Sequence, residues 1–261
     1  TTLGRGGSDT SAVAIAAALG ADDCEIYTDV DGVYTTDPRL CSKARKIDKI
    51  SYEEMMELAS LGAKVLQIRS VEIAAKYKLP LHVRSSFDSV EGTRVVSQEF
   101  LESVVVSGVA ADSNQVKFTL QNLPEGPGVA ARIFGALSDA AIVVDIIVQD
   151  VASSGHLTLS FTVGKVDQLS AMQVLNDLRG GDWAEMKIIE EANLAKVSIV
   201  GVGMQNHPGV ASKMFQLLGK NEINIKLITT SEIKVSCLIE NALVKRAVEA
   251  LHSGFGLDRV D

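Results

Sequence analysis

An internal repeat in the second half of the 261-residue chain limits the folds that it can adopt more than any other pattern does. Pro127-Gly128-Val129-Ala130 recurs as Pro208-Gly209-Val210-Ala211. Three further apolar positions match at the same offset, namely Phe134 with Phe215, Leu137 with Leu218 and Ile142 with Ile223. A duplicated segment of this kind indicates two copies of one structural module. The chain is therefore expected to contain the same small unit twice.

Each copy has the pattern of a small α+β module. The Pro-Gly pair opens a helix whose apolar residues recur at helical spacing: Val129, Ile133, Phe134 and Leu137, then Val210, Met214, Phe215 and Leu218. Strands are predicted at 116–120 and 142–148 in the first copy, and at 196–200 and 223–228 in the second. Alternating residues predict half-buried antiparallel strands over 157–163 and 233–239, and a last strand is expected near 186–189. This order is the ferredoxin-like βαββαβ plan.

The first part of the chain alternates between helix and strand. Helices are predicted at 8–19, 51–61 and 70–78, with strands at 24–28 and 81–84, which gives an α/β layer. The polar stretch 85–93 is predicted to be a linker or loop with turn chemistry. We expect three domains over residues 1–96, 97–192 and 193–261, the first α/β and the other two α+β.

A glycine-rich turn precedes the first predicted helix. Gly4-Arg5-Gly6-Gly7 leads into Ser8, Asp9 and Thr10, residue types that cap helices. Such a turn leaves free backbone N–H groups at the helix start, which suits a phosphate or a carboxylate, and Arg5 could clamp an oxyanion. A plain structural turn explains the same residues, because the spacing matches neither the P-loop nor the dinucleotide fingerprint.

A second polar loop follows the strand predicted at 24–28. Residues 29–39 combine Asp and Gly with hydroxyl groups, a rigid Asp37-Pro38 pair and the Arg39 guanidinium. A solvated surface turn is the simplest interpretation, but ligands of open α/β sheets bind where such strands end. The two loops together are expected to form half of a phosphoryl-transfer site.

Charge and composition limit the partners. A formal net charge of −8 with 5% aromatic residues argues against nucleic-acid binding. No apolar stretch approaches the roughly 20 residues of a membrane helix, and there is no cleavable signal pattern, so no membrane partner is expected. Cys24, Cys41 and Cys237 lie far apart without metal-ligand spacing, which indicates a reducing cytoplasm. The four histidines are also scattered, so we expect no protein-bound metal.

The two loops, followed by the segment Leu61-Gly62-Ala63-Lys64-Val65-Leu66-Gln67-Ile68-Arg69-Ser70-Val71-Glu72, resemble the C-terminal half of the kinase domain of aspartate kinase. The duplicated tail resembles the paired ACT domains that follow this kinase domain. The similarity is closest to the branch whose regulatory half also exists as a separate short subunit. Many relatives carry His-Pro where this chain has Gln67-Ile68, which fits that branch and leaves Lys64 unaffected.

The resemblance implies ATP, as its magnesium complex, as the phosphoryl donor to L-aspartate, with no prosthetic group. It implies that Arg5, Gly6, Gly7 and Ser8 hold the aspartate carboxylate, and that Arg5 and Asp9 are the catalytic residues. The implied ATP-binding residues are Thr28, Asp29, Tyr34, Thr35, Thr36, Asp37, Pro38, Arg39 and Lys64. A helix cap explains Asp9 equally well, and a solvated charge explains Lys64.

The two modules offer groups for an amino-acid effector. Free N–H groups after each Pro-Gly pair could take its carboxylate, and nearby carboxylates, amides and hydroxyls its ammonium. By resemblance the effector positions are Ala130, Val143, Val144, Asp145, Gln149, Asp150, Val210, Ala211, Asn224, Ile225, Ser231 and Glu232. Lys226 stands where Asp145 stands in the first copy, so the modules cannot bind one ligand identically. The alternative is that Pro-Gly only starts a helix.

The function implied is an aspartate kinase that makes 4-phospho-L-aspartate for lysine, threonine and methionine biosynthesis, feedback-inhibited by lysine and/or threonine. A non-catalytic amino-acid-binding regulatory subunit is the alternative; another amino-acid kinase, such as one for glutamate, fits the first part but not the doubled tail. Unpaired sheet edges predict a homo-oligomer, dimer or higher, through the ACT modules. Because the chain begins at Thr1, we expect a fragment that lacks the N-terminal kinase half and is inactive alone, with a longer catalytic subunit as a further candidate partner.

Overall fold

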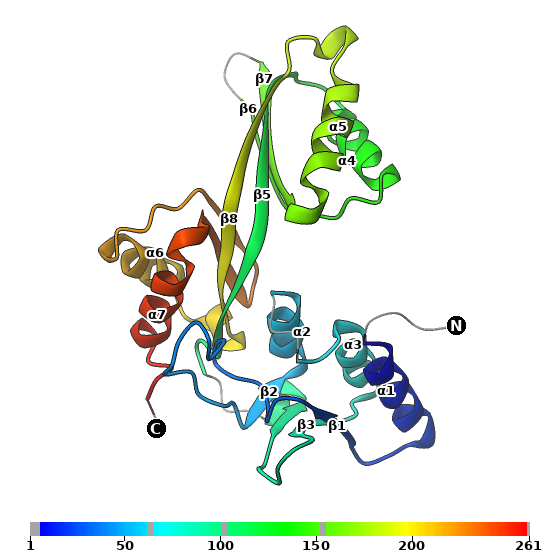
Figure 1. The fold of residues 1–261 in the computed structure, drawn as a ribbon, viewed down its shortest axis with the longest axis vertical. Helices are drawn as coiled ribbons and strands as arrows, with labels where there is room; N and C mark the ends of the chain where they lie inside the picture. The colour runs from blue at the N-terminus through cyan, green and yellow to red at the C-terminus, as the bar shows by residue number, and fades with distance from the viewer. Residues whose placement is uncertain (1–5, 62–64, 101–103, 152–154, 260–261) are drawn as a thin grey trace. The chain divides into compact units, whose positions relative to one another are not determined.

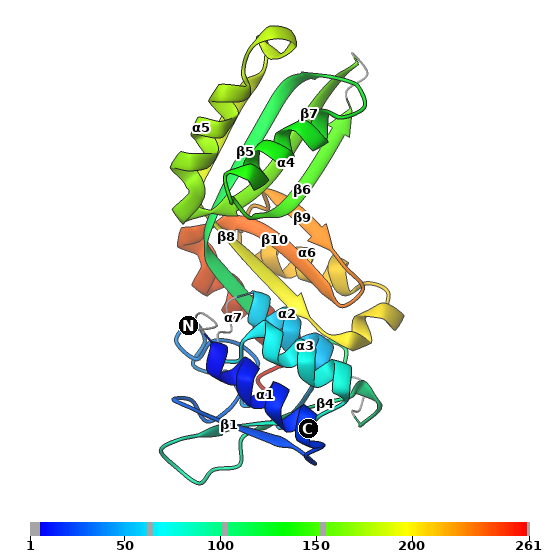
Figure 2. The same ribbon diagram turned by 90° about the vertical axis from the view of Figure 1, so that its right-hand side faces the viewer.

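The computed structural model describes residues 6–61, 65–100, 104–151 and 155–259. The chain forms two compact units. The first comprises residues 1–112, 197–239 and 243–261, and the second comprises residues 113–196 and 240–242. Figures 1 and 2 show the ribbon of each from two sides. The first predicted region and much of the second repeat copy therefore belong to one unit, and the boundary between the units falls inside two long strands.

A four-stranded sheet organises the first part of unit 1. It runs in the order β1-β3-β4-β2. Strands β1 (Cys24–Thr28) and β3 (Leu81–Ser85) pair in parallel with Cys24 opposite Leu81, and β2 (Lys49–Ser51) pairs in parallel with β4 (Thr93–Val96). Antiparallel pairing of β3 with β4 joins the two halves, so the polar segment between them is a loop within one sheet.

Three helices cover one face of this sheet, as both ribbon views show (Figures 1 and 2). They are α1 (Gly7–Leu19), α2 (Tyr52–Ser60) and α3 (Ile68–Tyr77). The expected capping of the first helix by Ser8, Asp9 or Thr10 is wrong. Gly6 is the N-cap with φ of 72°, and no side chain caps this end. Because a left-handed glycine already turns the chain, the helix begins one residue earlier and takes those three residues into its first turn.

The core of this layer is continuous with the second repeat copy. Met55, Leu58 and Val71 from the helices pack on Ile26, Leu81 and Val83 of the sheet. Ala110 and Val200, which lie outside the first predicted domain, are buried in the same cluster.

Unit 2 contains the first repeat copy. Its antiparallel strands follow the order β6-β7-β5-β8, from β5 (Gly108–Pro124), β6 (Val144–Val151), β7 (His156–Gly164) and β8 (Lys187–Val200). Helices α4 (Val129–Asp139) and α5 (Gln168–Leu178) complete the βαββαβ order. Phe118, Phe161, Ile133 and Leu137 are fully buried in its core.

The second copy repeats this order within unit 1 as far as its second helix, and no strand follows that helix among the described residues. Strands β8, β10 (Lys234–Glu240) and β9 (Leu227–Thr230) are neighbours in that order, with α6 (Val210–Lys220) and α7 (Val244–Gly254). Gly128 and Gly209, the N-caps of α4 and α6, have nearly the same backbone angles, with φ of 91° and 94°. The duplication read from the sequence is thus a duplication of structure, and the α/β plus α+β fold class is confirmed.

Four of the predicted strands differ in detail from the observed ones. The segments expected at 186–189 and 196–200 are parts of one strand, β8, and β9 begins at Leu227 rather than near Ile223. Residues 235–239 of β10 are all buried, so this strand is not half-exposed. The reason is that Ser236 and Leu238, on the face expected to meet solvent, are covered as well. Short 3-10 turns complete the fold: η1 (Gln98–Phe100), η2 (Lys165–Asp167), η3 (Gly181–Trp183), η4 (Val202–Asn206) and η5 (Asn241–Leu243).

Candidate functional site

The glycine turn brings the N-terminal ends of two helices together. A Cβ built on Gly6 would lie 2.9 Å from the Cβ of Gln67, the N-cap of α3. The Gln67 Oε1 accepts a hydrogen bond of 2.9 Å from the N–H of Ile68. Because both helix starts carry free backbone N–H groups, this end of the layer favours an anion. Arg5 and Lys64, predicted to add positive charge here, lie outside the described residues.

Ser8 and Asp9 lie in the first turn of α1. The Ser8 hydroxyl is exposed and donates to Asp9 Oδ1 at 3.3 Å. Since Gly6 supplies the cap without any side-chain hydrogen bond, the helix-cap alternative for Asp9 is wrong. Its half-buried carboxylate stays a candidate for orienting a substrate group.

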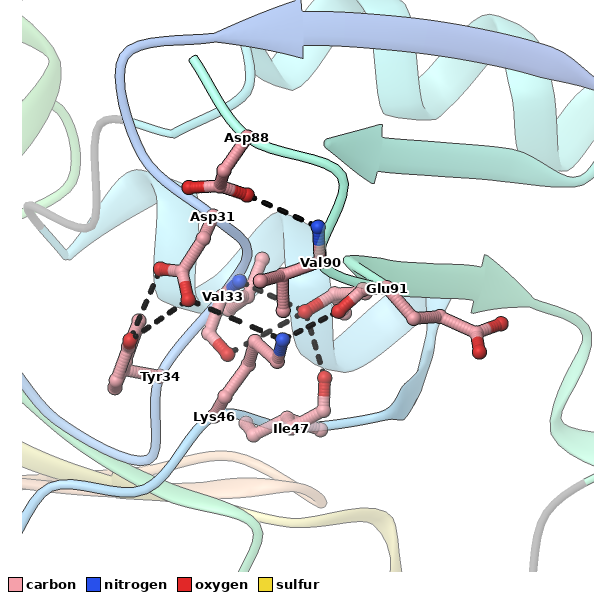
Figure 3. A network of polar contacts seen from close by, with 9 residues as sticks. Asp31, Val33, Tyr34, Lys46, Ile47, Asp88, Val90 and Glu91 are labelled. Atoms are coloured by element: carbon pink, nitrogen blue, oxygen red, sulfur yellow. Dashed lines mark hydrogen bonds and ion pairs between the residues drawn. The ribbon is translucent and has the colours of Figure 1, made fainter. Parts of the chain in front are cut away.

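The second loop is held by a polar network that the sequence prediction missed in part (Figure 3). The Tyr34 hydroxyl donates to Asp31 at 2.9 Å, and burial together with this carboxylate raises the Tyr34 pKa. Lys46 Nζ lies 3.9 Å from Asp31 Oδ2 and donates to the carbonyl oxygen of Glu91. Lys46 was not predicted, although the basic run Lys43-Ala44-Arg45-Lys46 is a sequence signal from which this cation could have been found.

Thr93 fastens the loop to the sheet. Its Oγ1 accepts from the N–H of Val33 at 2.8 Å and donates to the Ile47 carbonyl at 2.6 Å. Gly32 has φ of 148°, and a Cβ there would come within 2.6 Å of Thr93 Oγ1. The glycine is therefore required by close packing at this point.

Thr35 and Thr36 do not present free hydroxyls to solvent. Thr35 Oγ1 lies 2.8 Å from His252 Nε2 on α7 and accepts from the N–H of Arg45 at 3.0 Å. Its carbonyl accepts from the N–H of Val109 at 2.7 Å. The Thr36 hydroxyl is buried and finds no hydrogen-bond partner within the described ranges. Thr35 thus joins the loop to the second repeat copy.

At the end of the loop, Arg39 and Asp37 form an ion pair with each other. Arg39 Nη2 lies 2.7 Å from Asp37 Oδ2, with the Arg39 side chain 90% exposed. The hydrogen bond from Arg39 lowers the pKa of Asp37. Pro38 is exposed between them. The other predicted nucleotide residues at the loop start, Thr28 and Asp29, share a hydrogen bond of 3.1 Å.

In unit 2 the effector candidates lie on β6 and at the start of α4. Asp145 forms an ion pair with Lys196, whose side chain is only 7% exposed. Lys196 was not among the predicted residues. Ala130 is in the first turn of α4 and is half-buried. The remaining members on or beside β6 are half-buried or exposed: Val143, Val144, Gln149 and Asp150.

In the second copy two effector candidates line a depression. Ser231 and Glu232 border a space of about 420 Å³ together with Met204 and Gln205. Gln205 Nε2 donates to Glu232 Oε2 at 3.2 Å across it. The lining does not include the other four candidates: Val210 and Ala211 at the start of α6, and Asn224 and Ile225 before β9.

No group of three or more His, Cys, Asp or Glu side chains in the described ranges could hold a metal ion. None of the described helices combines the length and the apolar character that crossing a bilayer requires. Cys24, Cys41 and Cys237 are buried free thiols, and burial raises the pKa of Cys237 to about 12.

Comparison with known proteins finds family matches in three separate stretches of the chain. Residues 1–85 match the amino acid kinase family, and residues 121–178 and 197–255 match the ACT domain. An aspartate kinase of Stutzerimonas stutzeri (strain A1501) is 53% identical over 260 residues, which are 99% of this chain and 63% of that protein. The chain therefore spans a little under two thirds of the length of this relative.

Solved structures give the same picture. Aspartokinase III of E. coli in complex with aspartate and ADP has a TM-score of 0.81 at 33% identity, over 97% of this chain and 57% of that one. Its complex with lysine and aspartate has a TM-score of 0.80 at the same identity, over 98% and 57%. The regulatory subunit of aspartate kinase from Thermus thermophilus has a TM-score of 0.54 at 37% identity, over 58% of this chain and 99% of that subunit.

Proposed function

Because this chain belongs to the aspartate kinase family, we propose that the complete gene product transfers the γ-phosphoryl group of Mg-ATP to the side-chain carboxylate of L-aspartate. The observation that carries this proposal is the likeness, at 33% identity, to an aspartokinase bound to aspartate and ADP. The product is 4-phospho-L-aspartate, the first intermediate toward lysine, threonine and methionine. The proposed location is the cytoplasm.

The proposed chemistry fits the groups present. An aspartate carboxylate is already ionised at neutral pH, so its attack on the phosphorus atom needs no strong general base. Catalysis then rests on positioning and on neutralising the transferring oxygens. Arg5, Gly6, Gly7 and Ser8 would hold the substrate carboxylate beside the two helix starts, with Asp9 as an orienting group.

The nucleotide would lie against the second loop. Tyr34, Asp37, Pro38 and Arg39 would contact it, together with Thr28 and Asp29 at the loop start and Lys64 beyond α2. Thr36 would place nearby its hydroxyl, which is buried and has no hydrogen-bond partner among the described residues. Thr35 would act through its backbone and by holding the loop, because its hydroxyl is already shared between Arg45 and His252.

Regulation would be feedback inhibition by lysine and/or threonine. The ACT matches and the lysine complex of the E. coli relative support this assignment. The effector would contact the positions predicted on β6 and around Ser231 and Glu232. A homo-oligomer, dimer or higher, through the ACT modules would complete the assembly.

The decisive experiment is a kinase assay on the complete gene product with aspartate and Mg-ATP, with and without lysine and threonine. Aspartate-dependent formation of an acyl phosphate, trapped with hydroxylamine, and its loss with either amino acid are the expected results. Absence of aspartate-dependent turnover would reject the enzyme assignment.

A second candidate is a non-catalytic regulatory subunit that partners a longer catalytic subunit. The observation that favours it is that this chain matches 99% of the length of the Thermus thermophilus regulatory subunit, at 37% identity. The kinase assay separates the two, because a pure sensor would bind lysine or threonine in calorimetry while showing no turnover.

A further inference from the structure

Helix α2 is tied to both walls of the depression in the second ACT module. One wall is the turn η4, which supplies Met204 and Gln205, and the other is the turn before β10, which supplies Ser231 and Glu232. Two carboxylates of α2, Glu54 and Glu57, lie one helical turn apart. Glu54 is bonded to the first wall, and Glu57 is bonded to Lys234, the first residue of β10, which directly follows the second wall.

The first tie is a buried carboxylate. Glu54 is 2% exposed, and its Oε1 accepts from the N–H of Val202, the first residue of η4, at 3.0 Å. The same oxygen accepts from the Ser107 hydroxyl at 2.5 Å, while Oε2 accepts from the N–H and hydroxyl of Ser51. Oε2 thus caps α2, and Oε1 holds the wall formed by η4. Each of the two carboxylate oxygens accepts two hydrogen bonds.

The second tie is an ion pair. Glu57 Oε2 lies 2.7 Å from Lys234 Nζ, with the side chains 25% and 23% exposed. Lys234 is two residues after Glu232 of the depression. Because Glu57 follows Glu54 at the i+3 position, both ties lie on the same face of α2.

The two walls of the depression are bonded to each other, and the backbone at one of them is closely packed. The N–H of Gly201 donates to the Ile233 carbonyl at 2.9 Å, so the two walls are joined at their base. A Cβ on Gly201 would lie 2.3 Å from the Val105 carbonyl oxygen, and one on Gly203 would lie 2.5 Å from that of Val104. A close-packed backbone of this kind transmits a displacement rather than absorbing it.

We propose that α2 is the element through which a ligand in this depression acts on the kinase layer, with Glu54 and Glu57 as positioning residues. This inference rests on the proposed regulation by an amino acid. The Glu232 carboxylate, the Gln205 amide and the Ser231 hydroxyl suit the ammonium group of such a ligand. A ligand that spreads the two walls would displace α2 through these two ties.

The test uses lysine and threonine separately as probes on this chain. Calorimetry measures binding, and hydrogen exchange measures the protection of α2 with and without the probe. If the depression and α2 are coupled as strongly as typical allosteric sites, a bound amino acid changes the hydrogen-exchange rates of the α2 amides about fivefold or more. Helix α3, in the same layer, is the internal reference and is expected to change by less.

Two variants remove the second tie, Glu57→Gln and Lys234→Met. Each is expected to bind the probe while the change at α2 falls to about twofold or less, as for a weakly coupled site. The matched control is Glu191→Gln, because Glu191 forms an ion pair of the same length, 2.7 Å, with Lys117 in unit 2. This control is expected to keep the full change at α2.

The outcomes separate the two hypotheses. Probe binding with equal changes at α2 and α3, or with an unaltered response in Glu57→Gln and Lys234→Met, would overturn the role of α2 and leave the effector proposal standing. If calorimetry detects no binding of either lysine or threonine, the effector proposal is overturned, and so is the proposed role of α2, which depends on it.

Discussion

At the scale of single residues, Thr35 and His252 join the candidate nucleotide loop to the last helix of the chain. They are 217 positions apart, and their side chains meet at 2.8 Å. His252 is fully buried, and its Nδ1 finds no partner within the described ranges. The contact assigns Thr35 a structural role in a loop whose other members are candidates for ligand binding.

Thr35→Val is expected to lower the free energy of unfolding by about 1–3 kcal/mol, because it leaves the Arg45 N–H and the His252 ring without their shared partner. Urea denaturation of this chain measures the change. Thr119→Val is the control, since the Thr119 hydroxyl makes a single side-chain hydrogen bond, to the Ser160 hydroxyl, in the part of the chain that the structure describes, and its loss is expected to cost less. An equal loss in both variants would contradict the anchoring role of Thr35.

Two buried histidines predict a fall in stability at mildly acidic pH. Burial lowers the pKa of His82 and of His252 below the ordinary 6.5, helped by nearby cations. Below about pH 6.5 the unfolded chain therefore binds more protons than the folded one, so the contribution is complete above that pH and lost as pH falls. The expected slope is up to about 1.4 kcal/mol per pH unit for each histidine.

Unfolding free energies measured between pH 8 and pH 5 check this sign. His252→Gln is expected to flatten part of the profile. A stability that rises as the pH falls from 7 to 5.5 would show that these histidines are not held neutral.

At the scale of elements, the two ACT helices begin in the same way. Gly128 and Gly209 precede α4 and α6 with φ near +90°, a conformation that side chains other than glycine rarely adopt. The helix start after Pro-Gly is therefore set by backbone geometry in both copies. Nothing within 4 Å would obstruct a Cβ at either glycine, so the cost of a substitution is conformational.

Gly128→Ala and Gly209→Ala are each expected to destabilise the chain by about 1–2 kcal/mol, because both force alanine into a left-handed conformation. Gly135→Ala, inside α4 and with open space around its Cβ, is the control and is expected to stabilise by about 1 kcal/mol. Thermal unfolding measures the change in stability of each of the three variants. Clearly unequal losses at Gly128 and Gly209 would argue against equivalent helix starts.

At the scale of the whole molecule, the second ACT module shares a compact unit with the kinase layer, while most of the first forms its own unit. The kinase layer is bonded to the second module through Glu54, Glu57 and Thr35. Under the proposed regulation, an effector bound at that module would act on a structure that is continuous with the candidate catalytic loops.

In the complete gene product, Arg39→Ala is expected to raise the KM for ATP about tenfold, which corresponds to the loss of one charge-assisted contact of about 1.5 kcal/mol. The variant should fold normally, because the Arg39 side chain is 90% exposed. Steady-state kinetics measure the effect, and Arg246→Ala, exposed on α7, is the control. An unchanged KM would remove Arg39 from the nucleotide site.

Much of the fold follows from local sequence patterns. Periodicity and backbone preference predicted the Pro-Gly repeat, the helical spacing of Val129 and Ile133, and the strand at 24–28. Each of these features depends on residues that are close to one another in the sequence. The family resemblance rested on contiguous motifs in the same way. Exact helix caps and the buried second face of β10 depend on what packs nearby, and the predictions were wrong there.

Local patterns in the chain thus predict the modules and the candidate residue types of the site. They do not predict the long-range contacts: Glu54 accepts from the N–H of Val202, 148 positions away, Thr35 lies against His252, and Lys46 lies beside Asp31. The physical reason is that such bonds depend on where distant segments meet after the core has formed, and no local spacing in the chain records that meeting.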